Sequence, residues 1–218
     1  MQPIRTESVL DRVAPVSVVH VAVEVGHKKS FASALDWPGW SRSGKDEDAA
    51  IDTLLDYVDR YRVVTDRAGI EFRPGRIDVV ERLAGSGATD FGVPGAIAER
   101  EHRLLRKPQA ERLASLVSAS WDVFDDVVAA APAELRKGPR GGGRDRDKIV
   151  HHVVEAEQSY ARQIGLGKPN QRADLRGDIV AAIKQRPTDT AWPVRYVARR
   201  IAWHVVDHAW EIEDRSEA

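Results

Sequence analysis

The pattern of hydrophobic and polar positions is typical of strands in the first part of the chain. Residues 17–25 are rich in β-branched side chains and partly alternate between apolar and polar, as a half-buried strand does. Residues 30–35 alternate again, and residues 26–29 suit a hairpin turn between the two strands. Residues 77–83 have the composition of a further strand. The pattern therefore predicts a small sheet near the N-terminus.

A turn and a helix are expected between these strands. Residues 37–40, Trp-Pro-Gly-Trp, end the second strand because proline and glycine favour a turn. The acidic residues 46–48 suit the N-terminus of a helix, where the helix dipole favours negative charge. Apolar residues then recur at helical spacing to about Val64, which predicts one helix. Residues 84–89 are expected to form a loop.

From Pro94 onward the pattern is helical, with no convincing strand. Four helices with short breaks predict a four-helix bundle. The expected helices lie between Pro108 and Pro132 and at about 145–165, 175–186 and 190–214. The predicted fold class is thus α+β, with a small module over residues 1–92 and the bundle over 93–218. We expect the two modules to be separable, so that a fragment from Gly92 folds alone.

Composition and charge exclude several classes of protein. The chain has no cysteine, which removes disulfides, thiolate metal sites and a cysteine nucleophile. A net charge of −1 argues against nucleic-acid or membrane binding as the main role. No apolar run approaches the ~18–20 residues of a membrane helix, and the first residues lack the pattern of a signal peptide. We therefore expect a cytoplasmic location.

Two histidines four residues apart are the clearest candidates for chemistry. His204 and His208 share one face of the last expected helix, where two imidazoles can hold one divalent metal. Catalytic zinc sites commonly use three protein ligands, and the second expected helix supplies His152 or, as the alternative, His151. We expect His152, His204 and His208 to bind one metal ion, with zinc preferred over nickel or iron. The other interpretation is that these histidines only pack between helices or face solvent.

This arrangement resembles the DinB/YfiT-like family. The match covers roughly residues 105–215 and rests on the helix that carries His152 and on the later pair His204 and His208. The resemblance implies a four-helix bundle that holds a divalent metal on these three histidines. It also implies a bacillithiol- or mycothiol-dependent S-transferase, or an isomerase, in which a low-molecular-weight thiol such as mycothiol supplies the sulfur. A hydrolase in which the metal activates water would use the same ligands.

Other charged residues of the helical part could support such a site. Arg195, Arg199 and Arg200 could line a pocket for the carboxylates of the thiol, or form a solvated helix face. Glu157 is expected near the centre of the inward face of its helix, where a carboxylate needs a partner. We expect it to pair with Arg199 or Arg200, to orient a ligand histidine, or to act as a proton acceptor. The glycine-rich stretch 138–143 could hold an anion or serve as a flexible loop.

Two tryptophans and the N-terminal module complete the sequence-based expectations. Trp203 and Trp210 flank the histidines and could wall a pocket. Residues 31–44, a strand and Pro-Gly turn before an acidic helix start, resemble the HicB-like antitoxin module over about residues 18–62. We interpret this module as a recognition or dimerisation domain. A small-molecule substrate is expected, a homodimer is left open, and the alternative to an enzyme is a non-catalytic scaffold with a recognition module.

Overall fold

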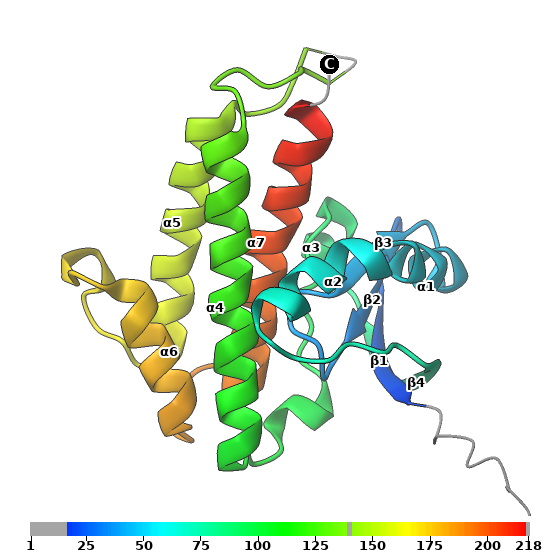
Figure 1. The fold of residues 1–218 in the computed structure, drawn as a ribbon. Coiled ribbons are helices and arrows are strands. Elements are labelled where there is room, and N and C mark those ends of the chain that lie inside the picture. The colour runs from blue at the N-terminus through cyan, green and yellow to red at the C-terminus, as the bar shows by residue number, and fades with distance from the viewer. Residues whose placement is uncertain (1–16, 139–140, 217–218) are drawn as a thin grey trace, which may run out of the picture.

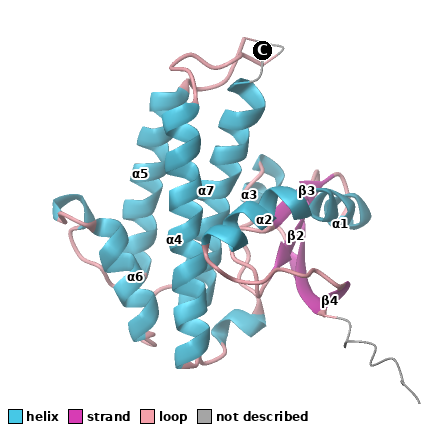
Figure 2. Cartoon of the chain, in the orientation of Figure 1, coloured by secondary structure: helices cyan, strands magenta, loops and turns pink. Residues whose placement is uncertain are grey.

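The computed structural model describes residues 17–138 and 141–216, which form a mixed α+β fold. Figure 1 shows the long helices side by side, with a small sheet and its helices packed against one flank. Figure 2 shows all strands gathered on this flank. The strands are β1 (Val18–Val25), β2 (Ser30–Ala34), β3 (Ser41–Gly44) and β4 (Arg76–Ala84), in the spatial order β3-β2-β1-β4.

The sheet follows from the alternation of apolar residues. β1 and β2 form the expected antiparallel hairpin, with Val23 opposite Ala32, and β3 extends it after the Pro-Gly turn. β4 runs parallel to β1 along the other edge. The expected strands at 17–25, 30–35 and 77–83 are confirmed.

Two helices replace the single one expected before β4. α1 (Glu47–Asp56) begins at Asp46, whose side chain accepts a hydrogen bond from the backbone of Ala49 at 2.9 Å. The chain bends at Tyr57, and α2 (Val58–Arg67) continues in a new direction. The bend lets the Tyr57 ring contact Trp210, with centroids 4.9 Å apart, while Tyr61 stacks on Trp40 at 5.8 Å. Tertiary packing therefore overrides a continuous helical pattern.

A short helix, α3 (Gly87–Phe91), begins within the stretch expected to be a loop. Ser86 caps its N-terminus, and the Thr89 hydroxyl accepts a hydrogen bond from the Ser86 backbone at 2.7 Å. Gly92 ends it with a φ of 103°, a conformation that glycine adopts without strain. The short 3₁₀ helices η1 (Glu99–His102) and η2 (Pro169–Gln171) lie in later connections.

The four helices expected after Pro94 are present, and the described part of the chain has no strand there. They share one hydrophobic core that includes Trp121, Phe124, Ile149, Ile183 and Ile201. None of the described helices is both long and apolar enough to cross a bilayer. The helices are α4 (Lys107–Ala130), α5 (Arg146–Gln163), α6 (Leu175–Gln185) and α7 (Val194–Ser216).

α7 contributes to two cores. Ile201 and Val205 belong to the core of the long helices, whereas Val206 and Trp210 pack with the sheet module. Ala119 and Val123 of α4 join this second core. An ion pair between Arg42 of β3 and Asp207 of α7, at 2.6 Å, adds a polar contact beside it. That a fragment from Gly92 folds alone stays a prediction, and in such a fragment Val206 and Trp210 would lose these partners.

Candidate metal centre

Three histidines meet between α5 and α7. His152 lies on α5, and His204 and His208 lie on α7. Each offers one nitrogen, and the three nitrogens lie within 4.8 Å of one another. The Nε2 atoms of His152 and His204 are 3.1 Å apart, and the three ring centroids are separated by 4.6–5.1 Å. The group is close enough to hold one metal ion.

The helical spacing explains which histidines come together. His204 and His208 are one turn apart on a single face of α7, which packs against α5. His152 faces them, whereas the side chain of His151 is 74% exposed and its Nδ1 lies 3.6 Å from Glu155. The structure therefore selects His152, rather than His151, as the third member.

Burial favours the neutral form of two of these imidazoles, those of His204 and His152. His204 is only 8% exposed, and burial, reinforced by the nearby His208 and His152, lowers its pKa to about 2. Burial also lowers the pKa of His152, which is partly exposed, and the charge of Arg144 acts in the same direction. Neutral imidazole is the form that binds metal, so the environment favours ligand chemistry over charged histidines.

Glu211 completes the group from the next turn of α7. Its carboxylate oxygen lies 2.8 Å from Nδ1 of His208 and can only accept, so Nδ1 carries the proton. In the neutral ring the lone pair is then on Nε2 of His208, as in the carboxylate–histidine–metal arrangement. The hydrogen bond from His208 lowers the pKa of Glu211, and Arg215 donates to its other oxygen at 2.6 Å.

The donor set fits a divalent metal. Zinc–imidazole bonds of ~2.0–2.1 Å in tetrahedral geometry place two ligand nitrogens roughly 3.3 Å apart, close to the 3.1 Å between His152 and His204. Nδ1 of His204 is buried with no hydrogen-bond partner in the described part of the chain. Nδ1 is not the nitrogen that faces His152, so His204 offers Nε2 to an ion and lacks the second hydrogen bond that orients His208.

The three arginines expected to bind the thiol do not share one pocket. Arg199 is 3% exposed, and its Nε and Nη2 atoms donate to the carboxylate of Glu101 at 2.7 and 2.9 Å. Arg200 donates to the carbonyl of Pro94 and to the hydroxyl of Tyr160. Arg195 lies nine residues before His204, about two and a half turns away, which places it on the opposite side of α7. Of these three arginines, only Arg200 lies close enough to His204 for its charge to lower the pKa of that imidazole.

Glu157 has partners other than those expected. It is buried, and it accepts a hydrogen bond from the Trp121 indole at 2.8 Å and pairs with Arg176 of α6 at 3.2 Å. Burial raises the pKa of its carboxyl group, and Arg176 opposes that rise. An ion pair between helices, rather than support for a histidine, accounts for this residue; the expected partners Arg199 and Arg200 are engaged elsewhere.

The aromatic residues near the histidines differ from the expectation in part. Trp203 is buried, with its ring 6.1 Å from that of His204 and edge-on to Phe31. Trp210 instead packs in the sheet interface described above. Tyr160, a buried core residue of α5, also lies near the group, with its ring centroid 6.0 Å from that of His204. Sequence reasoning also missed Glu211, although a carboxylate three residues after a ligand histidine is a usable signal.

A hollow of about 560 Å³ adjoins Glu211 at the C-terminal end of α7. Gly143 approaches Arg215 so closely that a Cβ would lie 2.7 Å from the Arg215 Nη2, and its φ is 115°. The glycine-rich stretch therefore lies beside the histidine group; residues 139–140 within it are outside the described residues. The residues that line the hollow are Arg136, Lys137, Gly138, Gly142, Gly143, Glu211 and Arg215.

Comparison with known proteins adds no further constraint on the site. No family model, curated protein or solved structure matches the chain. The interpretation of the site therefore depends on the side chains and on their geometry.

Proposed function

We propose that the chain binds one divalent metal ion through His152, His204 and His208. The observation that carries this proposal is the convergence of three imidazoles from two helices, with Glu211 fixing the proton on Nδ1 of one of them. Zinc is the preferred ion because it suits an all-imidazole set, with nickel or iron as alternatives.

The same features support membership of the DinB/YfiT-like class. α4 to α7 are interpreted as its four-helix bundle, with one ligand on the second helix and two on the last. The sheet with α1 is interpreted as a HicB-like module, because a hairpin, a Pro-Gly turn and an acidic helix start follow in that order.

The activity we propose is thiol-dependent group transfer or isomerisation. A bound divalent metal lowers the pKa of a coordinating thiol and thereby supplies a thiolate nucleophile. The chain itself has no cysteine, so the sulfur comes from a small-molecule thiol such as mycothiol. The partly exposed edge of His152 admits the reactant, and Glu211 holds the ring of His208 in place. Arg136 and Lys137 line the hollow beside Glu211 and suit the charged groups of such a molecule better than Arg199, which is buried against Glu101.

Metal analysis followed by thiol titration tests this function. We expect protein purified without chelator to hold about one equivalent of metal. Mycothiol and bacillithiol should bind the metal-loaded form by calorimetry and bind the chelator-treated form much more weakly. Equal affinity of both forms would exclude metal–sulfur coordination. Stoichiometric metal without thiol binding would favour the hydrolase, and the absence of metal would favour the non-catalytic scaffold.

A further inference from the structure

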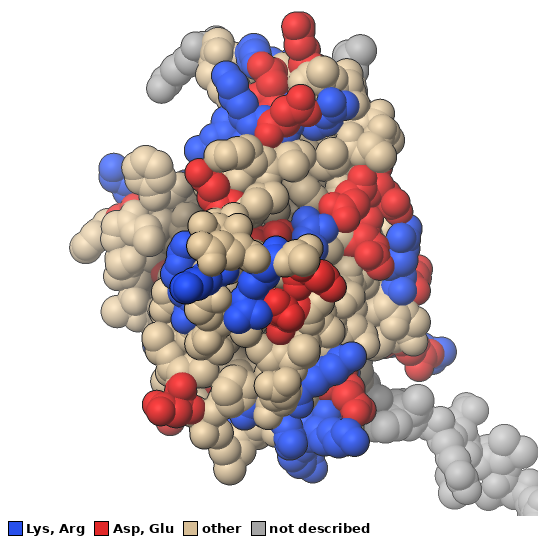
Figure 3. Space-filling view, turned by 90° about the vertical axis from the view of Figure 1, so that its left-hand side faces the viewer, with Lys and Arg blue, Asp and Glu red and all other residues tan. Residues whose placement is uncertain are grey.

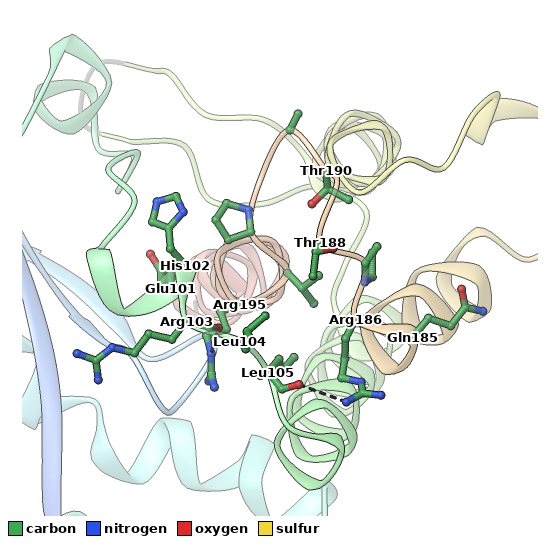
Figure 4. A pocket seen from close by; sticks show the side chains of 14 residues that line it. Glu101, His102, Arg103, Leu104, Leu105, Gln185, Arg186, Thr188, Thr190 and Arg195 are labelled. Atoms are coloured by element: carbon green, nitrogen blue, oxygen red, sulfur yellow. Dashed lines mark hydrogen bonds between the residues drawn. The ribbon is translucent and has the colours of Figure 1, made fainter.

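A second cluster of basic residues lies at the end of the long helices where α4 and α7 begin. Three hollows, of about 460, 120 and 230 Å³, all include Arg195 in their walls. Figure 4 shows the largest one, where Arg195 lies between Arg103 and Leu104, with Arg186 on the far side. Arg195 is thus at the meeting point of three adjoining spaces.

Two half-buried guanidinium groups, which form no ion pair in the described part of the chain, line the 230 Å³ hollow together with Asp36. Arg112 donates to the backbone carbonyl of Asp36, and its charge lies 4.1 Å from the ring centre of Trp37. Arg195 donates to the side chain of Gln109 at 3.0 Å and to the carbonyl of Arg103 at 3.4 Å. Burial lowers the pKa of both groups, but arginine stays charged at neutral pH.

The acidic residues nearby are already engaged. Asp36 accepts a hydrogen bond from His20 at 2.8 Å, and Glu101 forms its bidentate pair with Arg199. Arg100 and Arg103 add positive charge to the wall of the 120 Å³ hollow. Partly buried charges are costly unless an opposite charge is close, so this region favours an anion from outside the chain.

The helix dipoles act in the same direction. α4 and α7 both begin at this end of the molecule, and neither has an acidic residue in its first turn. The positive ends of two helix dipoles therefore add to the charge of the arginines. Figure 3, which views the molecule from the side that carries α5 and α6, shows one group of basic side chains at the lower end, besides others at the middle and top of this face.

We propose that this cluster is a binding site for a small molecule that carries an oxyanion, either a phosphate or a carboxylate group. Arg112 and Arg195 hold the oxyanion, with Arg100 and Arg103 at the rim. The adjoining 460 Å³ hollow accepts the uncharged remainder of the molecule, because apolar and neutral residues form much of its wall. These include Leu104, Leu105, Pro187, Thr188, Thr190 and Pro193.

The site is independent of the histidine group. Arg195 and His204 are nine residues apart on α7, which corresponds to about 13.5 Å along the axis and to opposite faces. Loss of anion binding is therefore distinguishable from loss of metal binding.

Calorimetric titration of the full chain with inorganic phosphate and with succinate, each at constant ionic strength set by chloride, tests the proposal. At least one of the two should bind with a stoichiometry of about one. Arg112→Gln and Arg195→Gln should each weaken binding about tenfold or more, because each removes a charged donor. Arg162→Gln, at an exposed arginine of α5, is the matched control and should bind as the wild type does. The metal content of Arg195→Gln should be unchanged.

Arg103 is exposed at the rim, so replacing it tests the site without disturbing buried packing. Arg103→Gln should weaken binding about threefold or more, because the variant removes one of the positive charges that create the electrostatic potential at the site. Binding of phosphate alone or of succinate alone identifies which oxyanion the site takes, and either result supports it. Failure of both anions to bind more tightly than chloride would overturn the proposal, as would unchanged binding in the Arg103→Gln and Arg195→Gln variants.

Discussion

Two buried polar clusters along α7 differ in the partners that their hydrogen-bonding groups find. Arg199 meets Glu101, an opposite charge whose two oxygens match two guanidinium donors, and donates again to the carbonyl of Ala96. His204 meets His152, a group of its own kind, and one of its nitrogens has no partner in the described chain. The guanidinium and the carboxylate satisfy each other without an added group, whereas the two imidazole Nε2 atoms that face each other can both bind one added metal ion. Burial alone does not separate structural from functional residues; the chemistry of the partner does.

Removing the two histidines of α7 should have the largest effect. A His204→Ala/His208→Ala variant is expected to lose stoichiometric metal, because a single remaining imidazole does not hold a divalent ion tightly. Elemental analysis of wild type and variant measures this loss. His151→Ala is the matched control on α5, since His151 is exposed and outside the group, and it should keep the metal. Full metal occupancy in the double variant would show that the ion lies elsewhere.

Among the variants that keep the metal, the one that breaks the Arg199–Glu101 ion pair should have the largest effect, and the effect is on stability. Arg199→Ala leaves a buried carboxylate without its partner, which should lower the free energy of unfolding by about 3–5 kcal/mol. Urea unfolding followed by circular dichroism gives this value, and metal content should not change. A loss comparable to that of the exposed-surface variant Arg162→Gln would contradict a structural role for the pair.

Replacing the residue that orients His208 should have an intermediate effect on metal binding. Glu211→Gln removes the acceptor charge beside Nδ1 of His208, and metal affinity should fall about 10–100-fold. Competition with a chelator of known affinity measures the change. Glu155→Gln, on the exposed face of α5 beside His151, serves as the control. An unchanged affinity in Glu211→Gln would mean that the ring of His208 needs no orientation.

Acid should affect the metal-free protein through His204. Its pKa is about 2 in the folded chain and returns to its ordinary value of 6.5 on unfolding. Below about pH 6.5 the unfolded chain therefore binds a proton that the folded chain does not. The free energy of unfolding should therefore decrease as the pH is lowered below about 6.5, by at most about 1.4 kcal/mol for each pH unit. Urea unfolding with chelator at about pH 7 and about pH 5 should show a steeper loss for wild type than for His204→Gln.

The elements and the histidines could be predicted from local pattern. Helical periodicity marked α4 to α7, and the spacing of four placed His204 and His208 on one face. The partner of Arg199 could not be found in this way, because Glu101 lies 98 residues away in a short connection without periodicity. The bend at Tyr57 likewise depends on contact with Trp210, which a helical pattern does not contain.

Because α7 is packed on both sides, it has little freedom to rotate about its own axis. A rotation would pull Val206 and Trp210 out of one core, or Ile201 and Val205 out of the other. His204 and His208 are therefore held at a fixed angle toward α5 before any ion arrives. The sheet module thus contributes to preorganisation, since less conformational entropy is lost when a ligand binds to groups that are already in place.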